Sequence, residues 1–169
     1  MATKLSRTPS SSGSNSKFTF SAWVKRTSLG ALSPMLSANA SSQVVFDAQD
    51  ELGVYNGASV IMETNRKFRD VSAWYHIVVT LDATESGTDK AKLYINGVQE
   101  TSFKTDNRSS FSTLAQINQS GVAMDIGSDG AGNFVGLMSH IHLTDGYAYQ
   151  ASTFGSTDST SGEWKINTA

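Results

Sequence analysis

Residues Val71 to Val98 read VSAWYHIVVTLDATESGTDKAKLYINGV, and this stretch decides the fold class. From Tyr75 to Leu81 the odd-numbered residues are all apolar, and most side chains are β-branched or aromatic, which is typical of a β-strand. Trp74 and Val78 add bulk to the opposite face, so we expect both faces of the strand to be covered. The stretch therefore predicts the central strand of a sandwich, with Trp74 in its core.

Two Asn-Gly pairs indicate hairpins on either side of this strand. Asn96-Gly97 follows the apolar run Lys92 to Ile95, and Asn56-Gly57 separates two further alternating runs, Glu51 to Tyr55 and Ala58 to Met62. Asn and Gly tolerate the positive φ of a type I′ turn, so each pair predicts a tight hairpin. No window shows a sustained 3.6-residue period. The sequence predicts an all-β sandwich of two antiparallel sheets, with less than about a tenth of the chain in helix.

The composition of the chain excludes several classes of function. The chain has 169 residues, which indicates a single domain, 1–169. Its net charge of −2 gives no basic surplus for nucleic acid, and the absence of cysteine excludes a disulfide framework. Neither a signal peptide nor a segment for membrane insertion is predicted, because the first residues lack an apolar run and no window is long enough to span a bilayer.

The central stretch also resembles a known family. WYHIVVTLD, a polar loop and LYINGV, in that order, are similar to the centre of the concanavalin A-like, laminin G-like jelly rolls. This resemblance implies that the sandwich is a jelly roll. The polar or irregular segments at about 1–16 and 147–169 are expected to form terminal arms on it.

A narrower resemblance lies in the two ends of the chain. LSRTPSSSGSNSKFTFSAWVKR, Leu5 to Arg26, and DGYAYQASTFGSTDSTSGEWKI, Asp145 to Ile166, resemble a family of virion proteins from phages of marine bacteria. The resemblance implies a non-catalytic structural protein on the virion surface, of capsid-decoration or tail-fibre type, released by lysis. It also implies homo-oligomers and contacts with other virion proteins. Longer relatives continue into a further strand that pairs near the amino end; here that edge is either left open for a partner or closed by Trp164 to Ile166.

The arms are the predicted contact surface. A low-charge surface suits packing against neighbours, because few charges lose their water, and charged residues make up only 17% of the chain. We place the contacts within residues 2–12 and 147–168. The predicted partner-binding residues are Leu5, Arg7, Tyr147, Tyr149, Phe154 and Trp164.

A glycan-binding lectin is the alternative function, since some aromatic side chains could stack on sugars. Trp23 and Trp74 are assigned to the core because they lie in strong strand patterns, and the position of a glycan site stays undetermined. A glycosidase fits less well. Retaining glycosidases need two carboxylates on one strand face, whereas Asp47, Asp50 and Glu51 cluster at a turn, so no catalytic residue is predicted.

Two groups of residues are candidate metal ligands. Asp125, Asp129 and Asn133, in a glycine-rich segment that also contains Ser128, offer oxygens of the kind that Ca²⁺ prefers, although the same residues are ordinary in turns. Calcium is thus a candidate, and no other cofactor is predicted.

The histidines form the second group. His140 and His142 stand two apart on a predicted strand and could face one metal ion, but no third ligand is near in sequence, so we interpret them as surface residues. His76 is predicted to be a hydrogen-bonded core or rim histidine.

Overall fold

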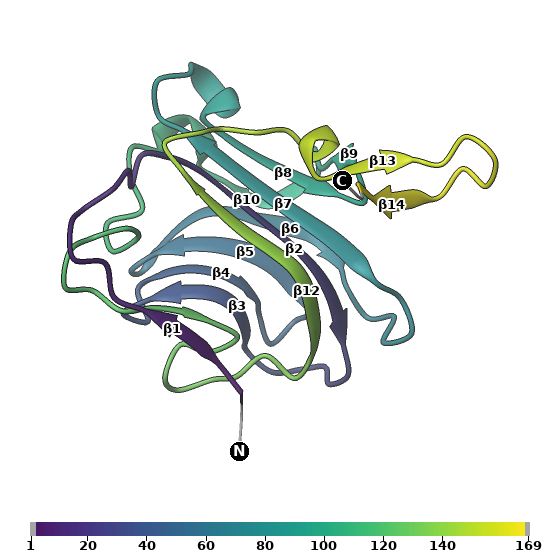
Figure 1. The fold of residues 1–169 in the computed structure, drawn as a ribbon, viewed down its shortest axis with the longest axis horizontal. Coiled ribbons are helices and arrows are strands. Elements are labelled where there is room, and N and C mark those ends of the chain that lie inside the picture. Colours follow the sequence, from purple (N-terminus) through teal and green to yellow (C-terminus); the bar gives the residue numbers. More distant parts are fainter. Residues whose placement is uncertain (1–2, 168–169) are drawn as a thin grey trace.

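The computed structural model describes residues 3–167 and consists of two antiparallel sheets packed face to face (Figure 1). The larger sheet has seven strands in the order β1-β11-β3-β4-β5-β6-β10. Their bounds are β1 Leu5–Arg7, β11 Met124–Ile126, β3 Ser33–Ala38, β4 Ser42–Phe46, β5 Glu51–Asn56, β6 Ser59–Lys67 and β10 Phe103–Asp106.

The smaller sheet has five strands in the order β12-β2-β7-β8-β9, and a separate hairpin pairs β13 with β14. The bounds are β12 Gly136–Asp145, β2 Lys17–Arg26, β7 Tyr75–Asp82, β8 Ala91–Ile95, β9 Val98–Gln99, β13 Gly155–Thr157 and β14 Trp164–Ile166. Helix is limited, within the described residues, to the short 3-10 turns η1 Gly87–Lys90, η2 Arg108–Ser110 and η3 Ala151–Thr153. The prediction of an all-β sandwich with very little helix is confirmed.

Strand β7 holds the centre of the smaller sheet, between β2 and β8. Its odd-numbered residues Tyr75, Ile77, Val79 and Leu81 are buried in the core between the sheets, because alternate side chains of a strand point to opposite faces. The predicted turn that follows β8 is also present, with φ of 49° at Asn96 and 79° at Gly97.

The prediction for Trp74 is wrong. β7 begins at Tyr75, one residue later, and the Trp74 side chain is 38% exposed. The two-residue alternation of side chains belongs to β7 alone. Residues Val71 to Trp74 precede the strand and have no regular secondary structure. Trp74 is therefore a surface residue at the end of β7.

The C-terminal arm, residues 147–167, covers the outer face of the smaller sheet. Figure 1 shows it in yellow, ending in the β13–β14 hairpin that projects from the sandwich. Val78, Tyr94 and Ala151 form a small second core beneath the arm, and Phe154 and Trp164 pack against it. This packing explains why the even-numbered face of β7 is apolar at Val78.

The two alternatives for the open edge are resolved by the hairpin. β14 pairs with β13 and not with the edge of either large sheet. Within the described residues, β1 and β12 lie at sheet edges, each with a strand on one side alone. Both of these edges are therefore unpaired within residues 3–167.

Candidate functional site

The three tryptophans of the chain meet at one surface pocket of about 430 Å³. Trp23 comes from β2, Trp74 from the segment before β7, and Trp164 from β14. The pocket, called the tryptophan groove below, is lined by Trp23, Trp74, Ser139, Trp164, Lys165 and Ile166. Half of its lining residues are tryptophans, and it lies on the outer face of the smaller sheet.

Trp164 is held in place from three sides. Its indole N–H donates to Nδ1 of His76 over 2.9 Å. Gly97 and Gly155 lie against the indole ring, and a Cβ atom at either position would overlap it. The hairpin thus presents Trp164 in a fixed orientation, which a binding wall requires.

His76 connects the arm to the sheet. Its ring stacks on Trp23, with centroids 5.0 Å apart and planes 15° apart, and lies 6.0 Å from Trp164. Because an indole can only donate, Nδ1 accepts from Trp164, and Nε2 carries the proton that it donates to Ser21 Oγ at 2.9 Å. The predicted hydrogen-bonded histidine is confirmed.

Burial lowers the pKa of His76 from its usual 6.5 to about 4, and the charge of His142 adds to this shift. His76 is 0% exposed, so the charged form would lose its water without gaining an acceptor. At neutral pH the ring is therefore uncharged, and the groove rests on a neutral Trp–His–Trp stack.

The start of the arm is fastened by two threonine hydroxyls. Thr19 Oγ1 donates to the Tyr147 carbonyl at 2.9 Å and accepts from the Tyr149 N–H at 2.7 Å. Thr80 Oγ1 donates to the Tyr149 carbonyl at 2.5 Å. The tyrosine rings stack on each other with centroids 5.6 Å apart, and Tyr147 is 61% exposed.

The predicted partner-binding residues therefore fall in two places. Tyr147, Tyr149, Phe154 and Trp164 belong to the arm on the smaller sheet, where Phe154 and Trp164 are half-buried. Leu5 and Arg7 lie elsewhere, on β1. Residues 1–2 and 168–169 of the predicted arms lie outside the described residues.

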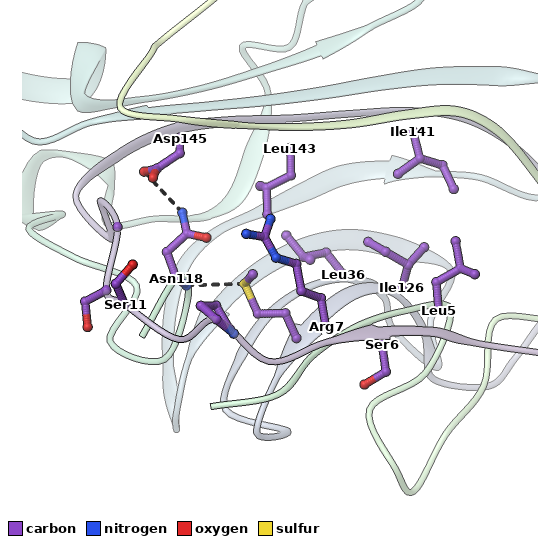
Figure 2. Close-up of a pocket in the computed structure, with 14 residues that line it drawn as sticks. Leu5, Ser6, Arg7, Ser11, Leu36, Asn118, Ile126, Ile141, Leu143 and Asp145 are labelled. Atoms are coloured by element: carbon purple, nitrogen blue, oxygen red, sulfur yellow. Dashed lines mark hydrogen bonds between the residues drawn. The ribbon is translucent and has the colours of Figure 1, made fainter. Parts of the chain in front are cut away.

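Leu5 and Arg7 border a second cavity of about 400 Å³, shown in Figure 2. It opens between β1 and β11 of the larger sheet and β12 of the smaller one. Its apolar lining consists of Leu36, Met124, Ile126, Ile141 and Leu143, together with Leu5 and Pro9. In Figure 2 the Arg7 side chain extends into the cavity towards Leu143. The cavity is an opening into the core between two free strand edges.

The predicted calcium ligands all take part in other contacts. Asp125 on β11 forms an ion pair with Lys4 at 2.8 Å. Asp129 accepts hydrogen bonds from backbone N–H groups of its own loop and from Gln43, and Asn133 bridges to Ser128 across the loop. These contacts are typical of turn chemistry. The calcium site stays a prediction.

All three histidines line one small cavity, but His140 and His142 do not follow the regular alternation of a strand. His140 has a φ of 47° and lies in a bulge of β12 between Ser139 and His142, so the two-residue alternation is broken there. His140 and His142 nevertheless line a small cavity of about 130 Å³ together with His76. The bulge and the sheet register, which are tertiary features, bring all three histidines to one place.

An acidic cluster occupies the outer face of the larger sheet. Oxygens of Asp47, Glu51 and Glu63 lie within 4.8 Å of one another. Lys104 Nζ is 2.8 Å from Glu51 and 3.4 Å from Glu63, and its hydrogen bond lowers the pKa of Glu51 despite burial. A glycosidase acid needs a raised pKa to hold a proton at neutral pH. Glu51 is therefore not suited to act as a general acid.

The fold and the groove define a class: a β-sandwich that presents an aromatic pocket on one sheet face. The chain belongs to the concanavalin A-like lectin/glucanases superfamily, whose sequence profile matches residues 3–163. No curated protein matches the chain in sequence. None of the helices in residues 3–167 has the length and apolarity to cross a membrane.

Three solved structures with this fold are similar over most of the chain. One is domain 4 of an extracellular arabinanase from Geobacillus stearothermophilus in complex with arabinotriose, at 19% identity and a TM-score of 0.57, covering 80% of this chain and 64% of that one. A candidate carbohydrate-binding protein from Bacteroides ovatus is 14% identical with a TM-score of 0.62, covering 95% and 54%. The CBM40 of a Ruminococcus gnavus sialidase, bound to α2,3-sialyllactose, is 15% identical with a TM-score of 0.55, covering 86% and 92%.

These similarities show the fold. The chain spans less than two thirds of the length of the first two.

Proposed function

We propose that this domain binds saccharides without catalysis, and that the tryptophan groove is the binding site. The observation that carries the proposal is the meeting of Trp23, Trp74 and Trp164 at one open pocket. Exposed aromatic rings grouped in a pocket are costly to leave in water and are typical of binding sites. The apolar C–H faces of a sugar ring pack well on such π faces.

The shape of the groove fits a short segment of a glycan chain. Its volume of about 430 Å³ lies within the usual range for small-ligand sites. Ser139 and Lys165 supply the polar groups at its border. Lys165 is 2.9 Å from Asp158, so its charge is already paired, which favours neutral sugars over anionic ones.

The fold supports the same function. Two similar domains are described with a bound saccharide, arabinotriose in one and α2,3-sialyllactose in the other. In the acidic cluster of the larger sheet, Lys104 lowers the pKa of Glu51, which is the opposite of what a general acid needs, so a hydrolase is the weaker candidate.

The test is a glycan array followed by titration of the strongest soluble glycan. Trp74→Ala should reduce the affinity about fivefold or more, because it removes one of three stacking surfaces, each worth about 1 kcal/mol or more. Val71→Ala is the matched control, because Val71 is an exposed apolar residue of the same segment that does not line the groove. Equal affinity of the two variants, or no bound glycan, would refute the proposal.

A second candidate function concerns where this domain works. We propose that it is a structural virion protein present in many copies, and that glycan binding serves attachment to a host surface. The motifs at Leu5–Arg26 and Asp145–Ile166 carry this proposal, supported by the free edges of β1 and β12, which another chain can pair with.

The assembly proposal has a separate test. Purified protein is mixed with particles that lack it, and bound copies are counted after sedimentation. Leu5→Glu should reduce binding, because Leu5 is 64% exposed at the cavity of Figure 2. If the wild-type protein stays in the supernatant at every salt concentration, the assembly proposal fails and the glycan proposal is unaffected.

A further inference from the structure

We infer that the smaller sheet carries a second saccharide site, distinct from the tryptophan groove, around Tyr94, Tyr147 and Tyr149. This inference rests on the proposed saccharide-binding function. The site is a pocket of about 310 Å³ that we call the tyrosine pocket. The residues that matter for the argument are Lys17, Asp82, Lys92, Tyr94, Tyr147 and Tyr149.

The arm separates this pocket from the tryptophan groove. Tyr149 contacts β7 at Thr80, Ala151 lies over Val78, and Trp164 binds His76, so the arm follows β7 from one end to the other. His76 and Asp82 are six residues apart, which places the two pockets about 20 Å from each other at about 3.3 Å per strand residue. Because η3 covers the strand between them, the two pockets are separate sites.

Tyr94 gives the pocket an unused polar group. The residue is 8% exposed, and its side chain packs with Val78 and Ala151. Its hydroxyl makes no hydrogen bond to any residue within 3–167, and it is not among the fully covered polar atoms that lack a partner. The hydroxyl therefore reaches the pocket, where it can donate to and accept from a ligand. Burial raises the pKa of Tyr94, so the hydroxyl stays protonated at neutral pH.

The border of the pocket offers both donors and acceptors. Lys17 is 2.7 Å from Asp82, and Lys92 is 3.2 Å from Asp89. Glu85 is the one further charge in the lining. Paired amines and carboxylates beside aromatic rings suit a ligand with many hydroxyl groups and no charge of its own. We therefore assign the pocket to a neutral sugar residue, and expect anionic sugars to be disfavoured by Glu85.

Two sites on one domain have a functional consequence. A single short glycan cannot occupy both, because the arm lies between them. Two chains, or two branches of one glycan, would be bound side by side, and simultaneous engagement raises the apparent affinity for a densely glycosylated surface. The tyrosine pocket thus makes the domain bivalent.

The experiment is a titration of the full chain with the strongest neutral glycan from an array, followed by calorimetry and by NMR. The stoichiometry should be two glycans per chain. Signals of the three indole N–H groups report the tryptophan groove, and the amides of Ala148 and Tyr149 report the tyrosine pocket. Trp74→Ala should weaken the tryptophan groove alone and Tyr149→Ala the tyrosine pocket alone, and Tyr94→Phe should weaken the tyrosine pocket about 3- to 10-fold by removing one hydrogen bond.

Ser152→Ala is the control, since Ser152 is exposed on η3 between the two pockets. The melting temperature of each variant shows whether it is folded. One glycan per chain, lost in Trp74→Ala and retained in Tyr149→Ala, would overturn this inference and leave the proposed function intact. Binding that depends on Tyr149 and not on Trp74 would retain the tyrosine pocket and refute the tryptophan groove. Absence of any bound glycan would refute both.

Discussion

The outer faces of the larger and the smaller sheet differ in the contacts that their side chains make. On the larger sheet, Glu51 and Glu63 are nearly covered and are held by Lys104, and Tyr55 donates to Glu63 at 3.0 Å. On the smaller sheet, aromatic rings and histidines stack beneath an arm that leaves a pocket at each end. On the larger sheet the charged groups pair with one another, whereas on the smaller sheet aromatic side chains remain open to a ligand.

This difference indicates which face has side chains that can still form contacts with a ligand. Acid–amine pairs neutralise each other, and a surface of such pairs gains little from a new partner. Open aromatic rings and an unused tyrosine hydroxyl gain contacts when a ligand arrives. The following four experiments test this contrast.

Removal of Trp164 should have the largest effect. Trp164→Ala loses the bond to His76 and the packing on Gly97 and Gly155, so unfolding should become easier by about 3 kcal/mol. Saccharide binding at the tryptophan groove should be lost with it. Urea unfolding measures the stability, and Trp164→Phe is the control, because it keeps a ring and should lose about 1 kcal/mol. A Trp164→Ala variant as stable as wild type would show that Trp164 contributes nothing to the fold.

Acidification should weaken the aromatic face next. The pKa of His76 in the folded protein, about 4, is below its unfolded value of 6.5, so the unfolded chain binds the proton more readily. Stability contributed by neutral His76 is therefore complete above pH 6.5 and is lost as the pH falls towards 4, with about 2 kcal/mol lost by about pH 5. His76→Gln keeps an acceptor for Trp164 and a donor for Ser21 without titrating. It should lose this pH dependence, and an unchanged pH profile would assign the effect to another group.

Neutralisation of Glu51 should have a smaller effect, confined to the charged face. Glu51→Gln removes the attraction to Lys104 and Lys67 and should cost about 1 kcal/mol in urea unfolding, because both lysines are partly solvated. Affinity for a saccharide should not change. A drop in affinity would mean that the two faces are coupled or that the larger sheet holds the site.

Trp74 should show the smallest effect on stability and a large effect on binding. Trp74→Ala should lower the free energy of unfolding by less than about 1 kcal/mol. The Trp74 side chain is 38% exposed and does not belong to the buried core. Thermal melts together with glycan titration measure the two effects on one sample. A loss of 3 kcal/mol or more would return Trp74 to the core.

Much of the fold was predictable because it depends on local signals. The alternation of β7 and the Asn96-Gly97 turn act over a few residues, and both are present in the structure. The predicted start of β7 was one residue too early, at Trp74, because the alternation of side chains does not show where a strand begins. The unpaired approach to β7 places that indole on the surface.

The candidate sites were less accessible to sequence reasoning. Trp23 and Trp164 are far apart in the chain, and we assigned Trp23 to the core and Trp164 to a partner surface. The glycines at positions 97 and 155 are the signal that was missed: a glycine in a hairpin turn and another beginning a strand, each making room for the same ring. The sequence does not show where the C-terminal arm runs, so it gave no reason to place these two glycines beside Trp164.

The sequence by itself determined the strands, the hairpins and a central strand covered on both faces, since these follow from side-chain period and turn chemistry between near neighbours. The tertiary structure alone decided what covers the outer face of β7. The arm binds there because Thr19, His76 and Thr80 offer hydrogen bonds to it while Val78 and Tyr94 offer apolar surface. These contacts join residues separated by up to about three quarters of the chain, so the two aromatic pockets come into being when the arm docks.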